Sequence, residues 1–202
     1  MTLLIGVPTT GHVKTQCFES IYNLEVPNEI RYHKLMFMPG YGVAKARNEL
    51  VSFALDNNFD YLFMVDDDMT FHSSTLCKLL ETDSMIVSAW AMQLNGTTNV
   101  LSYDAEANRY DCMSYQDLFK GVNDPLNPGV IEAKAVGMAC TLFKVELFKS
   151  LDYPYFVYHE YSNRTMIGED VYFCDKLKRE ASDRKIKIDL RIKAGHVKEV
   201  IL

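Results

Sequence analysis

The sequence predicts an α/β domain in which helices cover both faces of a mostly parallel central sheet. Two observations support this prediction. Short apolar runs typical of buried strands alternate with helix-forming stretches over the first 92 residues, and turn residues separate them. A length of 202 residues is enough for one such domain with a sizeable core. We therefore expect a single domain over 1–202.

Each element of the first half has a local signal. The run 3–7 is apolar and is followed by Pro8, which indicates a strand that ends there. Alanines and leucines favour a helix over 43–58, and the Asp-Asn-Asn sequence at its end is a natural stop. The same criteria predict further strands at 29–37, 60–65 and 84–92, and further helices at 12–24 and 73–81.

The second half is less regular. Between 93 and 135 we expect hairpin strands and a mobile loop around the turn-rich segment 121–129. A strand running into a helix is predicted over 135–151, a helix over 168–181 and a late strand over 185–190. The helix over 168–181 places its acidic residues at its N-terminus, where the helix dipole favours negative charge.

Composition narrows the class of protein. A net charge of −6 argues against a broad basic face for nucleic acid and leaves room for a small anionic ligand held by a metal. No apolar run approaches the roughly 18 to 20 residues of a membrane helix, and the N-terminus lacks the basic region of a signal peptide. Five scattered cysteines without a CxxC motif are typical of free thiols in a reducing compartment. We therefore expect a cytoplasmic protein with no membrane span.

Three consecutive carboxylates, Asp66, Asp67 and Asp68, follow the predicted strand 60–65. Adjacent anions repel one another, so their position directly behind a buried strand calls for a positive partner. Ligands of open α/β sheets bind beyond the carboxyl ends of the strands, where Pro8, Thr9 and Thr10 should also lie. Two carboxylates one residue apart can bind a hard cation, which would neutralise a leaving diphosphate.

Two other interpretations of the carboxylates stay open. In the simpler interpretation, the three carboxylates are solvated turn residues. In the other, the pattern Asp66-x-Asp68-x-Thr70 resembles the haloacid dehalogenase phosphatases, in which the first aspartate is the nucleophile. That motif normally closes the first strand of its domain, whereas a complete strand–helix–strand–helix unit precedes it here.

Four stretches, in order, resemble the GT-A glycosyltransferases that use nucleotide-sugar donors, in particular short family 2-like enzymes of viruses, phages and bacteria. The resemblance runs from residue 3 to about 198, and only 93–130 matches nothing in that family. It implies a nucleotide-binding half over about 1–92 and an acceptor half over about 93–202. The stretches are LLIGVPTT (3–10), YGVAKARNELVSFALDNNFDYLFMVDDDM (41–69), VGMACTLFKVELF (136–148) and GEDVYFCDKLK (168–178).

The resemblance implies roles for the residues of the nucleotide-binding half. Asp68 would be the metal carboxylate, and Asp66 would hold the ribose or share the metal. Asp67 would lie near the nucleotide, and Pro8 and Thr9, with Thr10 beside them, would contact the base and ribose. Arg47 would face the nucleotide, as the arginine of Ala-Arg-Asn does in that family. Its alternative is a salt bridge to one of the aspartates.

The second half supplies the remaining roles that the resemblance implies. Asp170 would be the general base that deprotonates the acceptor hydroxyl, with Glu169 as the alternative. Both could instead be acids that only complement the helix dipole. His196 would be a further metal ligand, and mixed imidazole and carboxylate ligation suits Mn²⁺ somewhat better than Mg²⁺. Lys198 could reach a phosphate oxygen.

The function implied is the metal-dependent transfer of a sugar, from a UDP-sugar in the first instance, to a hydroxyl of a glycan or other acceptor. Inversion at the anomeric carbon is expected with Asp170 as the base. If the protein is viral, the expected location is the host cytoplasm. The shortness of the chain leaves open that it is one domain of a longer protein. A nucleotide-binding or carbohydrate-binding module without catalytic activity is the further alternative.

Overall fold

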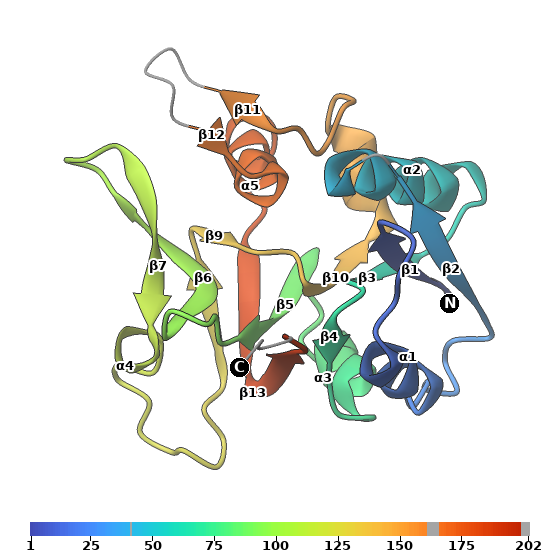
Figure 1. The fold of residues 1–202 in the computed structure, drawn as a ribbon, viewed down its shortest axis with the longest axis horizontal. Helices are drawn as coiled ribbons and strands as arrows, with labels where there is room; N and C mark the ends of the chain where they lie inside the picture. Colours follow the sequence, from blue (N-terminus) through green and yellow to red (C-terminus); the bar gives the residue numbers. More distant parts are fainter. Residues whose placement is uncertain (41, 161–165, 199–202) are drawn as a thin grey trace.

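A computed structural model describes residues 1–40, 42–160 and 166–198. A mixed sheet runs through the middle of the molecule, and helices lie above and below it (Figure 1). The strand order is β2 (Tyr32–Pro39), β1 (Thr2–Thr9), β3 (Tyr61–Val65), β10 (Cys140–Lys144), β5 (Ile86–Ala91), β13 (Ile186–His196) and β4 (Met69–Thr70), with β8 (Val130–Ala133) also paired to β13.

Most strands of this sheet run in one direction, as the sequence predicts. β1 is parallel to both β2 and β3, and β5 is parallel to β13. β10 lies between β3 and β5 and is antiparallel to both, so these two strands also share a direction. The carboxyl ends of β1, β3, β5 and β13 therefore meet at one edge of the sheet.

Successive side chains of each strand point to opposite faces of the sheet, so the hydrophobic core has two parts, one on each face. In β3, Leu62 and Met64 pack on the face covered by α2 (Val43–Asp56), α5 (Glu169–Glu180) and the 3₁₀ helix η1 (Val145–Ser150). Phe63 and Val65 point to the opposite face, which α1 (Thr15–Tyr22) and α3 (Thr75–Glu81) cover. Because successive side chains of a strand point to opposite faces, a strand buried on both sides is apolar throughout.

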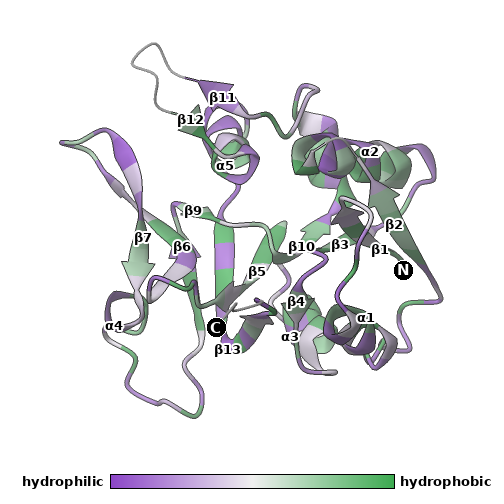
Figure 2. Cartoon of the chain, in the orientation of Figure 1, coloured by the Kyte–Doolittle hydropathy of each residue, from purple (hydrophilic) through white to green (hydrophobic). Residues whose placement is uncertain are grey.

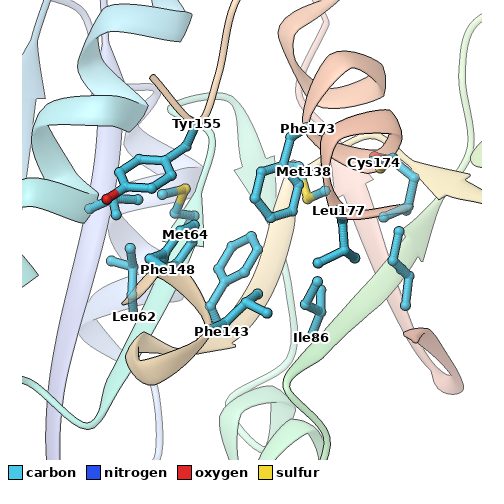
Figure 3. Close-up of a cluster of buried hydrophobic side chains, with 14 of the residues drawn as sticks. Leu62, Met64, Ile86, Met138, Phe143, Phe148, Tyr155, Phe173, Cys174 and Leu177 are labelled. Atoms are coloured by element: carbon cyan, nitrogen blue, oxygen red, sulfur yellow. The ribbon is translucent and has the colours of Figure 1, made fainter. Parts of the chain in front are cut away.

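The position of α5 on the sheet comes from a stripe of apolar side chains. Phe173 and Leu177 point from α5 toward Phe143 of β10 and Ile86 of β5 (Figure 3), and Cys174 Sγ contacts the carbonyl of Val136 in β9. The ring of Phe173 also stacks on Phe156, with 4.8 Å between ring centroids. Residues four apart share a helix face, so Glu169 lies on the same face as Phe173 and Leu177. The packing that buries these two side chains therefore draws Glu169 inward as well.

The second half of the chain adds an antiparallel extension. β6 (Thr97–Asp104) and β7 (Arg109–Ser114) form the expected hairpin, which pairs with β9 (Ala135–Val136). Figure 2 shows hydrophobic strands in the middle of the molecule and a hydrophilic tip on this hairpin. The short helix α4 follows at Tyr115–Leu118, and β11 (His159–Glu160) pairs with β12 (Met166–Ile167).

The predicted elements are largely confirmed, two of them with corrections, and the short elements β4, α4, β11 and β12 were not predicted. Residues 145–150 form a 3₁₀ helix rather than an α-helix, and the late strand extends from the predicted end at 190 to His196. The extension is possible because β5, β8 and β4 provide partners for its backbone groups. All five cysteines are free thiols. Within the described residues, the helices are all too short or too polar to cross a membrane.

Candidate functional site

The three aspartates lie in a tight turn at the end of β3 that backbone hydrogen bonds hold from three directions. Asp66 N donates to the carbonyl of Ala139 at 3.0 Å. The carbonyl of Asp67 accepts from Lys14 N at 2.9 Å, and that of Asp68 accepts from Val197 N at 2.8 Å. The turn is therefore tied to the start of β10, the end of β13 and the start of α1, at the sheet edge where ligands of such folds bind.

A buried guanidinium lies behind this turn. Arg47 of α2 is only 2% exposed, and its two terminal nitrogens donate to Asp66 Oδ1 and Glu169 Oε1, each at 2.7 Å. Burial alone would lower the pKa of Arg47, but the charges of Asp66 and Glu169 outweigh burial and raise it. The structure therefore shows Arg47 in the salt bridge that was its alternative role. It joins β3 to the first turn of α5.

Glu169 is the most constrained carboxylate of the site. Burial raises its pKa, Arg47 opposes that rise, and the neighbouring charge of Asp170 adds to it. The hydroxyl of Tyr158 also hydrogen-bonds Glu169, and burial together with the Glu169 charge raises the pKa of Tyr158. A carboxylate with these partners is suited to holding α5 in place.

The carboxylate of Asp170 lies beside two glycines, Gly168 and Gly137. Its Oδ1 accepts a hydrogen bond from Val171 N at 2.7 Å. A Cβ added to Gly168 would lie 2.7 Å from Oδ1, and one added to Gly137 would lie 3.3 Å from Oδ2. Gly137 is held in turn by Asn99, which accepts from its N–H at 2.8 Å and donates to its carbonyl at 3.0 Å. Sequence reasoning missed both Gly137 and Asn99, which lack a local signal.

Asp68 and His196 are brought together by the C-terminal strand. β13 pairs with β4, so His196 lies opposite Met69, the residue directly after Asp68. The Nδ1 of His196 lies 3.3 Å from the carbonyl of Met92. A carbonyl only accepts, so this contact assigns the proton to Nδ1 and leaves Nε2 able to bind a cation. Lys198 Nζ forms an ion pair with Asp68 Oδ2 at 2.5 Å.

The residues of this corner fit a divalent cation that a bound phosphate would help to hold. In the part of the chain that is described, no three His, Cys, Asp or Glu side chains gather as a metal site. Asp68 and His196 nevertheless offer a carboxylate and an imidazole on neighbouring segments, and the Nδ1 of that imidazole already contacts a carbonyl. Mg²⁺ and similar ions commonly take only one or two protein ligands and complete their shell with water and phosphate oxygens. Asp66 has one oxygen engaged by Arg47.

The end of β1 lies at the same edge of the sheet but uses its polar groups locally. Thr9 is 8% exposed, and its hydroxyl accepts from Gly11 N at 3.1 Å and contacts the carbonyl of His12 at 3.4 Å. Pro8 is buried in the strand, whereas Thr10 is exposed. The roles of these three residues toward a nucleotide stay predictions.

A cavity of about 850 Å³ lies between the segment after β5 and the end of β13. Its volume is in the range of small-molecule sites. The sequence analysis did not single out Gln93, Asn95 or Lys193. The lining residues are Met92, Gln93, Leu94, Asn95, Lys193, Ala194, Gly195, His196 and Lys198.

Comparison with known proteins gives matches at the level of structure. The search of protein-family models and the search of curated proteins both found no match. A197 from STIV superposes with a TM-score of 0.65 at 18% identity, over 98% of this chain and 87% of A197. GalNAc-T7, solved with UDP, GalNAc and Mn²⁺, gives a TM-score of 0.66 at 10% identity, over 98% of this chain.

A third solved structure is S. aureus TarS 1–349 in complex with UDP-GlcNAc, with a TM-score of 0.55 at 16% identity over 99% of this chain. The present chain spans 44% of the GalNAc-T7 chain and 60% of the TarS chain. These similarities establish the fold: the chain has the GT-A fold of nucleotide-sugar glycosyltransferases.

Proposed function

We propose that this protein is a metal-dependent glycosyltransferase that moves a sugar from a nucleotide-diphosphate donor to an acceptor hydroxyl. The observation that carries the proposal is the arrangement at one sheet edge of the GT-A fold. There Asp68 and His196 would hold a cation, and Asp170 lies in the first turn of α5, which Arg47 ties to the turn of the aspartates. UDP is the favoured nucleotide because GalNAc-T7 was solved with UDP and Mn²⁺, and TarS with UDP-GlcNAc.

The donor would be held by the end of β3 and the C-terminal segment. Asp68 and His196 would bind Mn²⁺ or Mg²⁺, with the second oxygen of Asp66 available to the cation or the ribose. When bound, the cation supplies charge stabilisation for the departing diphosphate. Lys198 would exchange its contact with Asp68 for a phosphate oxygen. In this proposal Pro8, Thr9, Thr10 and Asp67 lie beside the base and ribose.

Asp170 would act as the general base. It takes the proton of the acceptor hydroxyl while that oxygen bonds to the anomeric carbon and the bond from that carbon to the diphosphate breaks. Attack from the side opposite the leaving group inverts the anomeric configuration. Glu169 would position Asp170 through its contact with Arg47 rather than transfer the proton itself. Slow hydrolysis of the donor is expected when water replaces the acceptor.

Calorimetric titration tests the proposal. UDP, GDP and CMP are titrated into the protein with Mn²⁺ and then with EDTA, using wild type, Asp68→Ala and, as a control, Glu49→Ala on the exposed face of α2. We expect one nucleoside diphosphate to bind in the micromolar range only with metal. Asp68→Ala should abolish that binding, and Glu49→Ala should leave it unchanged.

Other outcomes identify the alternatives. If no nucleotide binds, the transferase proposal fails. A covalent aspartyl-phosphate on Asp66 would then favour the phosphatase, although Arg47 already occupies one oxygen of that side chain. Metal-dependent nucleotide binding without transfer or hydrolysis of any donor would identify a binding module.

A further inference from the structure

The cavity beside His196 has a charge opposite to that of the protein as a whole. The chain carries a net charge of −6. Among the described residues, the cavity lining nevertheless includes Lys193, His196 and Lys198 and no carboxylate. A concave surface lined by one sign of charge focuses its potential and raises the local concentration of ligands of the other sign. The cavity is therefore suited to an anion.

Lys193 is the residue that gives this cavity an uncompensated charge. It lies on β13 opposite Trp90 of β5, and its Nζ is 5.5 Å from the centre of the indole ring. The ring attracts the ammonium group without neutralising it. Among the described residues Lys193 has no ion pair, whereas Lys198 is paired with Asp68. Trp90 itself is 5% exposed and donates from Nε1 to Leu190, so it supports Lys193 from the core.

The cavity lies on the side of the site that holds Asp170, away from β1. In the sheet, β3 and β10 separate β1 from β5 and β13, which frame the cavity. One residue links the cavity to Asp170: Asn99 accepts from Ala91 N at 2.7 Å, directly before the lining residue Met92, and also holds Gly137 beside Asp170. The cavity therefore adjoins the proposed diphosphate site through His196 and Lys198, and Asn99 connects its other end to the glycine beside the proposed base.

We propose that this cavity binds the acceptor, and that the acceptor is a sugar carrying a phosphate or carboxylate group that pairs with Lys193. This inference rests on the proposed transferase function. The side-chain amides of Gln93 and Asn95 provide hydrogen-bonding groups for sugar hydroxyls, and Met92 and Leu94 provide apolar contacts for a ring face. The cavity would select an anionic acceptor over a neutral one, because a neutral sugar leaves Lys193 without an ionic partner.

NMR titration of the ¹⁵N-labelled protein tests the inference. Glucose 6-phosphate, glucuronate and neutral glucose are added to protein saturated with UDP and Mg²⁺, because paramagnetic Mn²⁺ would broaden the signals. Wild type is compared with Lys193→Gln and with Lys149→Gln, an exposed lysine on η1. We expect one anionic sugar to bind at least about ten-fold more tightly than glucose, with shifts at residues 92–95 and 193–196, and an affinity that falls with added salt. Lys193→Gln should remove that preference, and Lys149→Gln should keep it.

The remaining outcomes separate this inference from the proposed function. If UDP binds but charged and neutral sugars bind equally, or Lys193→Gln has no effect, the inference is overturned and the transferase proposal stands. If the anionic sugars bind only without UDP, the cavity belongs to the donor diphosphate and the acceptor assignment is overturned. If UDP does not bind with any metal, the transferase proposal fails and the acceptor inference fails with it.

Discussion

Asp66 and Asp68 are two residues apart in one turn, yet their surroundings differ. Asp66 pairs with Arg47, whose side chain is 3% exposed and shared with Glu169. Asp68 pairs with Lys198, whose side chain is 40% exposed and lies at the cavity. A buried pair is costly to break, because separation leaves an unpaired charge out of water, whereas an exposed pair exchanges partners at little cost. One aspartate of the motif is therefore tied to a buried cation that also holds α5, and the other to an exposed cation that can exchange partners.

The largest expected effect comes from removing the buried cation. Arg47→Ala leaves Asp66 and Glu169 facing each other without compensation, and breaking a buried pair costs about 3–5 kcal/mol. Urea denaturation of wild type and variant measures the change in the free energy of unfolding. Lys198→Ala, the exposed counterpart, serves as the control, with an expected loss of up to about 1 kcal/mol. Equal losses in the two variants would contradict the distinction between the two aspartates.

The two aspartates can be compared directly by amide substitution. Asp66→Asn weakens a charge-assisted hydrogen bond to a buried guanidinium, so a loss of about 1.5–3 kcal/mol is expected. Asp68→Asn should cost about 1 kcal/mol or less, because its partner is exposed. Thermal unfolding of both variants at neutral pH gives the ranking. A more destabilising Asp68→Asn would show that the C-terminal segment depends on its ion pair.

The raised pKa of Glu169 predicts a pH dependence of stability. Burial favours its protonated form in the folded protein, so its contribution to stability is full below the usual carboxyl pKa of 4.5 and is lost as pH rises through the folded value. Glu169→Gln removes this titration and should flatten the stability curve above pH 4.5. Denaturation series across pH 4–8 measure the difference, with Glu146→Gln on η1 as the control for loss of an exposed carboxylate. A wild-type curve that Glu169→Gln leaves unchanged would contradict the direction of the shift.

The smallest effect concerns the contact between Lys198 and Asp68. If the ammonium group competes with a cation for Asp68, Lys198→Ala should tighten Mn²⁺ binding in the absence of nucleotide. An exposed pair worth up to about 1 kcal/mol corresponds to a gain of up to about five-fold in affinity. Calorimetric titration with Mn²⁺ alone measures this change, and Lys149→Ala provides the control. Weaker metal binding in Lys198→Ala would show that the lysine orients Asp68 rather than competing for it.

Local patterns in the sequence predicted most of the helices and strands and the sheet edge at which the three carboxylates lie. Apolar runs, alanine-rich stretches and turn residues predicted the strands and helices of the first half. The spacing of apolar residues and the signals that end a helix or strand are both local properties of the sequence. The three carboxylates that follow residues 60–65 indicated the carboxyl edge of the sheet, because they come directly after a predicted strand. The resemblance in four stretches gave the GT-A fold, which the structural comparisons support.

Only the tertiary structure determined which charged side chains pair with one another. Arg47 and Glu169 are 122 residues apart, and the hydrogen bond between them forms because Phe173 and Leu177 bury the same face of α5. His196 reaches the turn of Asp68 because β13 continues to pair beyond the predicted strand. The antiparallel insertion of β10, the glycines around Asp170 and the basic cavity beside Lys193 also depend on contacts between distant segments. Such contacts leave no periodic trace in a sequence, because each is fixed by the packing of elements rather than by neighbouring residues.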